Sequence, residues 1–236
     1  QDATASMVHR LPVSHARISL DYRLKHFVDG VRLPAERAHA SWREVLNIDA
    51  QQSLFRPAVK AELGAYDPFI NFAEPFSAAQ SLGEQNRFMY ADLHTYLLND
   101  HLRKIDRTSM AHSVEAREPL LDYRIVEFAM RLPAEHKVNY RETKRILREI
   151  ARPLLPAAVV SGSKKGLTPP IPAWISNDLA HYVKGQLRGG IVDELFESEP
   201  IERILADHLA RRVDNSRLIW ALLSLQVWAR HAGVGF

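Results

Sequence analysis

Residues 92 to 122 read DLHTYLLNDHLRKIDRTSMAHSVEAREPLLD, a pattern that predicts a helix followed by a polar connection ending at a proline. Apolar side chains recur at three- and four-residue steps, on one helix face: Leu93, Leu97, Leu98, Leu102 and Ile105. The other face carries Asp100, Arg103, Lys104 and Arg107. Pro119 disfavours helical backbone at the residue before it, so the helix ends upstream. So many ionisable groups indicate either a solvated face or paired charges around a site, because unpaired charges are costly to bury.

The segments on both sides of this stretch also have helical periods. We expect helices at residues 20–31, 34–47, 50–63, 84–113, 123–132, 143–152, 173–187, 200–212 and 216–231. Asp49 and Asp122 are candidate N-caps, and Pro57 indicates a kink or a later start in the third of these helices. Residues 1–16, 65–83 and 156–172 have no clear period. No strand pair or repeat stands out, so the prediction is a mainly α chain forming a single helical domain over residues 1–236.

Three of these helices have apolar faces that we expect to be buried. The first face comprises Ile125, Val126, Phe128, Ala129 and Leu132, and the second comprises Ile146, Leu147 and Ile150. The second helix turns its basic side chains outward: Lys144, Arg145, Arg148 and Arg152. The last helix carries Trp220, Leu223, Leu225, Val227 and Trp228. The helical spacing of its two tryptophans indicates core positions.

The composition excludes several classes of protein. Hydrophobic residues make up 46% of the 236 residues, which argues against disorder, and the absence of cysteine excludes disulfides and thiolate metal sites. No apolar run is long enough for a membrane helix, and without disulfides or a leader-like segment we expect a cytoplasmic protein. The net charge of +3 is dispersed, which does not favour a nucleic-acid partner. His94 and His101 lack metal-ligand spacing. Because the sequence starts at Gln1 without Met, we interpret it as a fragment.

The segment SGSKKG at residues 161–166 is a candidate anion site. Its two glycines permit tight turns whose N–H groups point at an anion, and its two lysines add positive charge. Taken alone, this composition favours an exposed basic loop, because Gly/Lys loops are common.

Residues 106–122 resemble a motif of the C-terminal synthetase domain of glutamine-dependent asparagine synthetases, D-R-x-S-M-A-x-S-x-E-x-R-x-P-F-L-D. The matching residues are Asp106, Arg107, Ser109, Met110, Ala111, Ser113, Glu115, Arg117, Pro119, Leu120, Leu121 and Asp122, with Glu118 and Leu120 as departures from the usual residue types. Further features follow in the family's order: Leu132-Pro133, Lys137, the helix at 143–152, Leu155-Pro156, Lys164-Lys165-Gly166 and the segment 169–174. The resemblance covers residues 20–230.

This resemblance implies the helical C-terminal portion of an adenine nucleotide alpha hydrolase-like α/β synthetase domain, with most of the parallel sheet upstream and absent. The implied reaction uses ATP and Mg²⁺ to activate aspartate as an aspartyl-adenylate, which ammonia from glutamine attacks. Lys164 would be catalytic, and Lys164, Lys165 and Gly166 would hold the phosphates, because a fixed cation stabilises the departing pyrophosphate. Asp106, Arg107, Ser109, Glu115 and Arg117 would support the site from behind its wall. We expect small-molecule substrates, no nucleic-acid or membrane partner, and a homo-oligomer.

Glu115 and Arg117 have a second interpretation, a buried pair that ties their segment to Asp106 or Arg107. They are two residues apart and would not face each other on a helix, but in an extended segment both could reach partners.

Several parts of the family pattern are missing. The Ser-Gly-Gly-x-Asp-Ser phosphate loop, the Gly-Asp-Gly-Gly-Asp-Glu-like acidic segment and the glutaminase cysteine do not occur in this sequence. We therefore expect the isolated chain to be inactive and to self-associate through exposed apolar surface. Gly162 and Ser163 replace the family's Arg and Pro beside Lys164, which bears on the stiffness of that loop. Two alternatives stay open: an amidotransferase of this family acting on another carboxylate, and a non-catalytic helical interaction domain.

Overall fold

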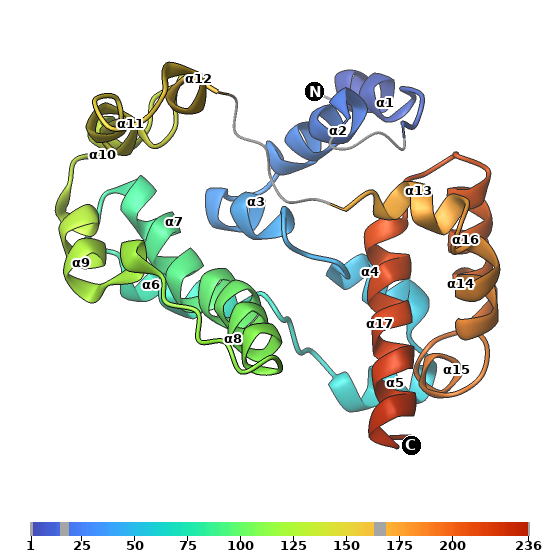
Figure 1. Cartoon of the computed structure of the whole chain (residues 1–236). Coiled ribbons are helices and arrows are strands. Elements are labelled where there is room, and N and C mark those ends of the chain that lie inside the picture. Colours follow the sequence, from blue (N-terminus) through green and yellow to red (C-terminus); the bar gives the residue numbers. More distant parts are fainter. Residues whose placement is uncertain (1, 15–18, 163–168, 236) are drawn as a thin grey trace. The chain divides into compact units, whose positions relative to one another are not determined.

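The computed structural model describes residues 2–14, 19–162 and 169–235 (Figure 1). Within these ranges the chain forms helices and no β-strand. Its β-type pairing there is limited to two isolated bridges, Phe55 with Phe196 and Val138 with Thr143. The prediction of a mainly α chain is therefore confirmed. Internal contacts group the chain into two compact units: unit 1 is Gln1–Pro68 with Leu167–Phe236, and unit 2 is Phe69–Gly166.

Unit 1 combines helices from both ends of the sequence. They are α1 (Asp2–His9), α2 (Leu20–Gly30), α3 (Ala35–Ser41), α4 (Ile48–Leu54), α5 (Pro57–Leu63), α13 (Ile171–Ser176), α14 (Ala180–Gln186), α15 (Ile191–Leu195), α16 (Ser198–Leu209) and α17 (Ser216–Ala232). The last of these, red in Figure 1, packs against α13, α14, α15 and α16. The Phe55 and Phe196 rings stack 4.7 Å apart and join the end of α4 to the end of α15.

The core of unit 1 forms along α17. Ile219 and Leu222 of this helix are almost fully buried, as are Ile175 of α13, Val183 of α14 and Val192 of α15. The predicted burial of Leu223 is confirmed, whereas the predicted core positions of Val227 and Trp228 are wrong, because these side chains are 40% and 55% exposed. The apolar residues of α17 extend around more of the helix than its neighbours in the described chain cover.

One buried amide completes this core. Gln226 of α17 is fully buried; its Oε1 accepts a hydrogen bond from the Val192 N–H (3.1 Å), and its Nε2 donates one to the Gly189 carbonyl (2.6 Å). The amide thus satisfies a free N–H in the first turn of α15 and a carbonyl just before that helix. Gly190 lies between them with φ 65° and ψ −153°, a region almost restricted to glycine.

Unit 2 contains the sequence that resembles the synthetase motif. Its helices are α6 (Ile70–Ala78), α7 (Glu84–Asp92), the π-helix η1 (Leu93–Leu102), α8 (Arg103–Met110), the 3₁₀ turn η2 (Pro119–Leu121), α9 (Tyr123–Arg131), α10 (Ala134–Lys137), α11 (Arg145–Ala151) and α12 (Ala157–Val160). The buried apolar side chains of unit 2 in the described ranges are few, namely Phe72, Phe76, Ala79 and Ala91.

The long helix predicted at 84–113 is present, but its middle third is π-helical. The elements α7, η1 and α8 follow one another without a break from Glu84 to Met110. Leu93, Leu97 and Leu102 are half-buried, whereas Leu98 and Ile105 are exposed, so the apolar face is only partly covered. A π-helical stretch is rare and often marks a functional site.

The predicted apolar faces of α9 and α11 are only partly buried in the described chain: Val126, Ala129, Leu132 and Ile146 are half-buried. Ile125 and Phe128 of α9 are 42% and 57% exposed, and Leu147 and Ile150 of α11 are also exposed. Arg148, predicted to face outward, is instead half-buried and bonded to backbone carbonyls. Elements of the described chain cover only part of these two apolar faces.

Other predictions need corrected boundaries. Helix α3 ends at Ser41 rather than at residue 47, and Asn47 rather than Asp49 caps α4 by accepting a hydrogen bond from the Ala50 N–H (2.8 Å). The helix predicted at 50–63 is two helices because Pro57 begins the second one, as that proline indicated.

The helix predicted at 173–187 is likewise divided into α13 and α14. Helices α1 and α6 occupy segments in which no period was recognised; Pro75 lies inside α6. By contrast, α2, α9, α16 and α17 lie within three residues of their predicted bounds.

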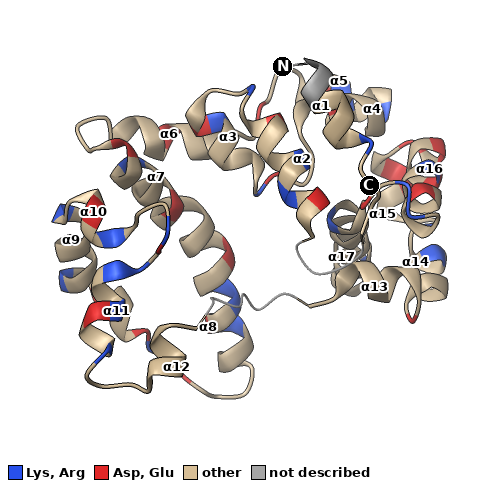
Figure 2. Ribbon diagram, turned by 90° about the horizontal axis from the view of Figure 1, so that it is seen from above, with Lys and Arg blue, Asp and Glu red and all other residues tan. Residues whose placement is uncertain are grey.

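No helix in the described part of the chain has both the length and the apolar content to cross a membrane. Lys and Arg are interspersed with Asp and Glu on the helices of each unit (Figure 2).

Candidate functional site

The motif segment begins where α8 ends, in a Schellman turn. The Val114 N–H donates to the Ser109 carbonyl (3.0 Å) and the Ser113 N–H to the Met110 carbonyl (2.9 Å). Ser113 adopts φ 56°, the left-handed conformation that this turn requires and that glycine usually supplies. The chain therefore leaves the helix abruptly and continues without regular structure from Val114 to Glu118.

Glu115 and Arg117 pair with each other in this irregular segment. The Arg117 guanidinium donates to both carboxylate oxygens of Glu115, Nε to Oε1 (3.0 Å) and Nη2 to Oε2 (3.1 Å). The Arg117 side chain is 82% exposed and the Glu115 side chain 66%. The predicted buried pairing with Asp106 or Arg107 is wrong, because non-helical backbone lets residues two apart face the same side. An exposed pair of this kind contributes little to stability, since water screens it.

The three predicted residues on α8 lie before the turn. Asp106 and Arg107 are exposed, whereas Ser109 is half-buried and donates its hydroxyl hydrogen to the Asp106 carbonyl (3.2 Å). The structure thus brings Asp106, Arg107, Ser109, Glu115 and Arg117 onto one short segment with its charged groups in solvent.

The motif closes at a capped helix. Pro119 begins the η2 turn, and the Asp122 carboxylate then accepts a hydrogen bond from the Arg124 N–H (2.9 Å) as N-cap of α9. The Arg124 guanidinium also donates to both oxygens of Asp122 (2.9 and 2.8 Å). These bonds hold the pKa of the Asp122 carboxyl below its ordinary value, first through the Arg124 side chain and then through its backbone. The predicted cap is confirmed.

The predicted phosphate-binding residues Lys164, Lys165 and Gly166 lie outside the described residues, but the chain leading to them is described. The Arg148 guanidinium of α11 donates to the Val160 carbonyl, to Gly162 O (3.5 Å) and to Thr143 O (3.1 Å). A Cβ atom at Gly162 would lie 2.8 Å from the Ala158 carbonyl oxygen, so this backbone leaves no room for a larger residue. Arg148 therefore holds the backbone at Val160, the last residue of α12, and at Gly162, two residues before Lys164.

Lys137, one of the residues that follow the motif in the family's order, joins α10 to α7. Its Nζ donates to Asn86 Oδ1 (2.6 Å), and Asn86 Nδ2 donates to the Met130 carbonyl at the end of α9 (2.8 Å). Burial lowers the pKa of the Lys137 ammonium. This chain of bonds links three helices of unit 2 through one amide.

Ser176, His208 and Asp214 in unit 1 are arranged like a hydrolytic triad, but the ring nitrogen that faces the serine carries the hydrogen. His208 is fully buried, with Nε2 at 3.3 Å from Ser176 Oγ and Nδ1 at 3.6 Å from Asp214 Oδ1. The Asn215 N–H donates to Nδ1 (3.3 Å), so the neutral ring carries its hydrogen on Nε2 and donates it to Ser176. A ring that donates to the serine cannot take its proton, so this group is structural.

The described residues contain no cluster of three or more His, Asp or Glu side chains that could hold an ion. We therefore assign none of these residues a role in holding Mg²⁺.

Sequence reasoning missed one feature of unit 1, a cavity of about 380 Å³ lined by residues from His9 to Leu218. No motif marks it, because its walls come from helices about 200 positions apart in the sequence.

Comparison with known proteins agrees with the motif. The family model described as Asparagine synthase matches residues 3–230. The chain is 31% identical over 180 residues to asparagine synthetase [glutamine-hydrolyzing] 1 of Bacillus subtilis, covering 74% of this chain and 28% of that protein. It is 33% identical over 143 residues to putative asparagine synthetases [glutamine-hydrolyzing] of Mycobacterium bovis and Mycobacterium tuberculosis, covering 60% of this chain and 22% of each.

The matched region thus spans about a quarter of the length of these relatives. No solved structure matches the chain. The family match over nearly the whole chain and the helical fold lead to one conclusion: this chain belongs to the asparagine synthase family and is a mainly α part of its synthetase domain.

Proposed function

We propose that the chain supplies one wall of a synthetase site that amidates aspartate through an aspartyl-adenylate, with ATP and Mg²⁺ as cofactors and ammonia drawn from glutamine. The observation that carries this proposal is the segment 106–122, which has the family motif and a fixed turn that presents Glu115 and Arg117 to solvent. An exposed charged segment held by backbone bonds on both sides suits a wall that another part of an enzyme completes.

Lys164 is the proposed catalytic residue, with Lys165 and Gly166 beside it at the phosphates. Adenylation builds negative charge on the departing pyrophosphate, and a fixed cation there lowers the barrier. Arg148 supports this assignment as a positioning residue, because it holds the backbone at Val160 and Gly162 just before Lys164.

The exposed apolar side chains of unit 2 support the view that a further part of the synthetase domain covers them. Those at least half exposed around α9, α11 and α12 include Leu120, Tyr123, Phe128, Tyr140, Ile150, Leu154 and Val159. Large exposed apolar patches mark interaction surfaces. We infer that the sheet-bearing part of the domain packs here, and that the isolated chain self-associates through the same patch. A monomer that persists at high concentration in sedimentation velocity would contradict this inference.

The purified chain, given ATP, Mg²⁺ and aspartate, should release no pyrophosphate, because the phosphate loop and acidic segment of the family are not in its sequence. Clear aspartate-dependent release would overturn that expectation.

The role of Lys164 is tested in a chimera. The matched part of the Bacillus subtilis relative is replaced by this chain, and Lys164→Met is compared with Lys184→Met on α14. Loss of a group that stabilises transition-state charge should lower kcat by about 10²–10³-fold for Lys164→Met alone. Equal activity of the two variants would remove Lys164 from the chemistry, and activity with a different carboxylate would replace aspartate as substrate.

A further inference from the structure

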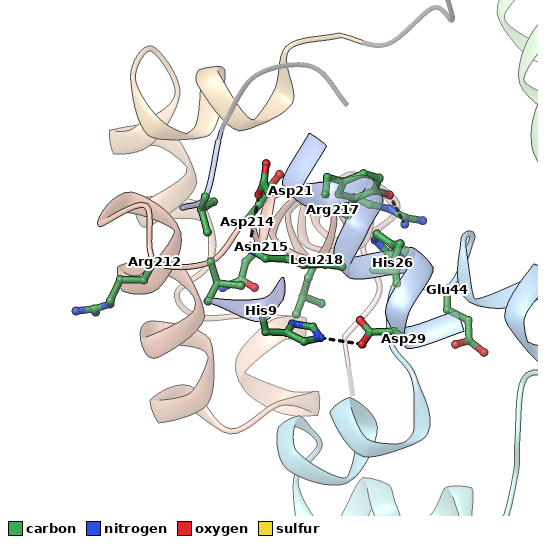
Figure 3. Close-up of a pocket in the computed structure, with 15 residues that line it drawn as sticks. His9, Asp21, His26, Asp29, Glu44, Arg212, Asp214, Asn215, Arg217 and Leu218 are labelled. Carbon is green, nitrogen blue, oxygen red and sulfur yellow. Dashed lines mark hydrogen bonds and ion pairs between the residues drawn. The ribbon is translucent and has the colours of Figure 1, made fainter. Parts of the chain in front are cut away.

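Unit 1 contains a cavity that the proposed synthetase function does not use. It has a volume of about 380 Å³, within the range of small-molecule sites, and lies between α1, α2, the segment after α3 and the start of α17 (Figure 3). A second cavity of about 360 Å³ adjoins it and shares His26, Asp29, Glu44 and Val45.

Most charges around the cavity are already paired. Lys25 lies 3.6 Å from Asp21, and His9 Nε2 lies 2.8 Å from Asp29. Arg212 pairs with Asp207 (2.7 Å), and Asp214 accepts a hydrogen bond from the Ser216 N–H (3.0 Å). Among the described residues that line the cavity, this leaves Arg217 as the cation without a carboxylate in contact, and Glu44 as the carboxylate with neither a cation nor a hydrogen-bond donor in contact.

Arg217 is a cation at the positive end of a helix. It lies in the first turn of α17, where the helix dipole disfavours positive charge and attracts anions. Its Nη1 donates to the Trp42 carbonyl (3.1 Å) and to the Tyr22 hydroxyl (3.5 Å), both neutral groups. These bonds direct the guanidinium and leave its charge available to a carboxylate.

Glu44 is the complementary group. Burial raises the pKa of its carboxyl, an effect that the charge of Arg37 opposes, and no hydrogen bond to the carboxylate is found in the described chain. A partly buried carboxylate without a donor is costly, and a bound ammonium group would offset that cost.

The wall of the cavity also contains uncharged side chains. In the view of Figure 3, His26 lies between Arg217 and Glu44. Its ring stacks on Trp42 at 5.0 Å, and burial, together with Arg217, lowers the pKa of His26. The remaining lining includes apolar side chains, namely Val13, Val45, Val213 and Leu218. The cavity thus combines Arg217 and Glu44 with charged groups that already have partners and with a partly apolar wall.

We propose that this cavity binds a small amino acid as its zwitterion, with the ligand carboxylate on Arg217, the ammonium group on Glu44 and the hydrocarbon part against the valines. The proposal is independent of the synthetase assignment, because none of these residues belongs to the motif segment or to the Lys164 loop.

The test uses the complete chain and four five-carbon probes in calorimetric or NMR titrations. L-norvaline and 5-aminopentanoate are isomers that carry both charges at different separations, whereas pentanoate and pentylamine each carry one. We expect at least one isomer to bind tenfold or more tightly than both single-charge probes. If the unmodified protein binds all four probes equally, or binds none of them, the proposal is overturned.

Matched variants then locate the charges. Arg217→Gln and Glu44→Gln should each weaken binding of the preferred isomer at least tenfold. Arg212→Gln, which lines the same cavity but is paired with Asp207, should change it less than twofold. Far-ultraviolet circular dichroism checks that each variant is folded. Full binding by folded Glu44→Gln or Arg217→Gln would refute the assignment.

Discussion

Replacing Gln226 by leucine tests how the core of unit 1 is held together. The amide is fully buried and bonds to the Val192 N–H and the Gly189 carbonyl. Leucine is close in size but leaves both backbone groups without a partner, at a cost of about 1–3 kcal/mol for each buried group. Part of this cost is offset by the apolar side chain, so we expect a net loss of about 2–4 kcal/mol in the free energy of unfolding.

The assay follows from the positions of the aromatic residues. All four tryptophans of the chain, at 42, 174, 220 and 228, lie in unit 1, so urea unfolding followed by tryptophan fluorescence reports on this unit. Ser224→Ala, at an exposed site of the same helix, is the control and should change stability by less than about 0.5 kcal/mol. A Gln226→Leu variant as stable as this control would refute the reasoning.

A double-mutant cycle sharpens the same test. A Cβ at position 190 would lie 2.9 Å from Gln226 Nε2, and the backbone there is in a region that favours glycine. Gly190→Ala should therefore cost about 1–3 kcal/mol from the backbone alone, and more while the amide is present. Combined with Gln226→Ala, it should cost less than the sum of the single changes. Strict additivity would mean that the two residues do not touch.

Further predictions concern unit 2. Ser113→Gly should stabilise the chain by about 0.5–1 kcal/mol in urea unfolding, because glycine adopts the left-handed turn without strain, and a loss of stability would contradict the turn. The pKa of Asp122 is depressed, so its cap contributes fully above the unfolded-state pKa and is lost as the pH falls through the lower folded-state pKa. Hydrogen exchange of α9 should accelerate over that acid range, whereas Asp122→Asn should keep the cap and lose this pH dependence. Arg148→Gln should speed exchange at residues 157–162 by about tenfold or more, since it removes bonds of roughly 1.5–3 kcal/mol each, while exposed Arg152→Gln should not.

Local signals in the sequence predicted much of the fold. Helix α17 has a long apolar pattern, and α9 has both a capping aspartate and an apolar period. Such signals depend on residues that are close in sequence, so they can be recognised without knowing which element packs against the helix. Helix α6 was missed because Pro75 lies inside it, and the divided helices show that a period alone does not reveal a break.

The faces that helices bury were less predictable than the helices themselves. Phe128 and Ile150 have the right spacing for buried positions but are exposed, because burial depends on a packing partner that the period does not identify. The π-helical geometry at Leu93–Leu102 has no sequence signature comparable to a cap.

The candidate site was predicted in part. The motif residues share one segment, and the Asp122 cap was expected, but the Ser113 turn and the Glu115–Arg117 pair were not. A left-handed serine cannot be distinguished from a helical one by residue type. The cavity around Arg217 and Glu44 depends on contacts between distant helices and leaves no local pattern.

The most direct test of the central claim is asparagine synthesis by the Bacillus subtilis relative in which this chain replaces the matched part. Glutamine hydrolysis by the same purified chimera serves as the check that it is folded. We predict that the chimera forms asparagine and pyrophosphate with aspartate and ATP, and that both products disappear when aspartate is omitted. A chimera that hydrolyses glutamine but releases no pyrophosphate with aspartate would contradict the proposed role of this chain.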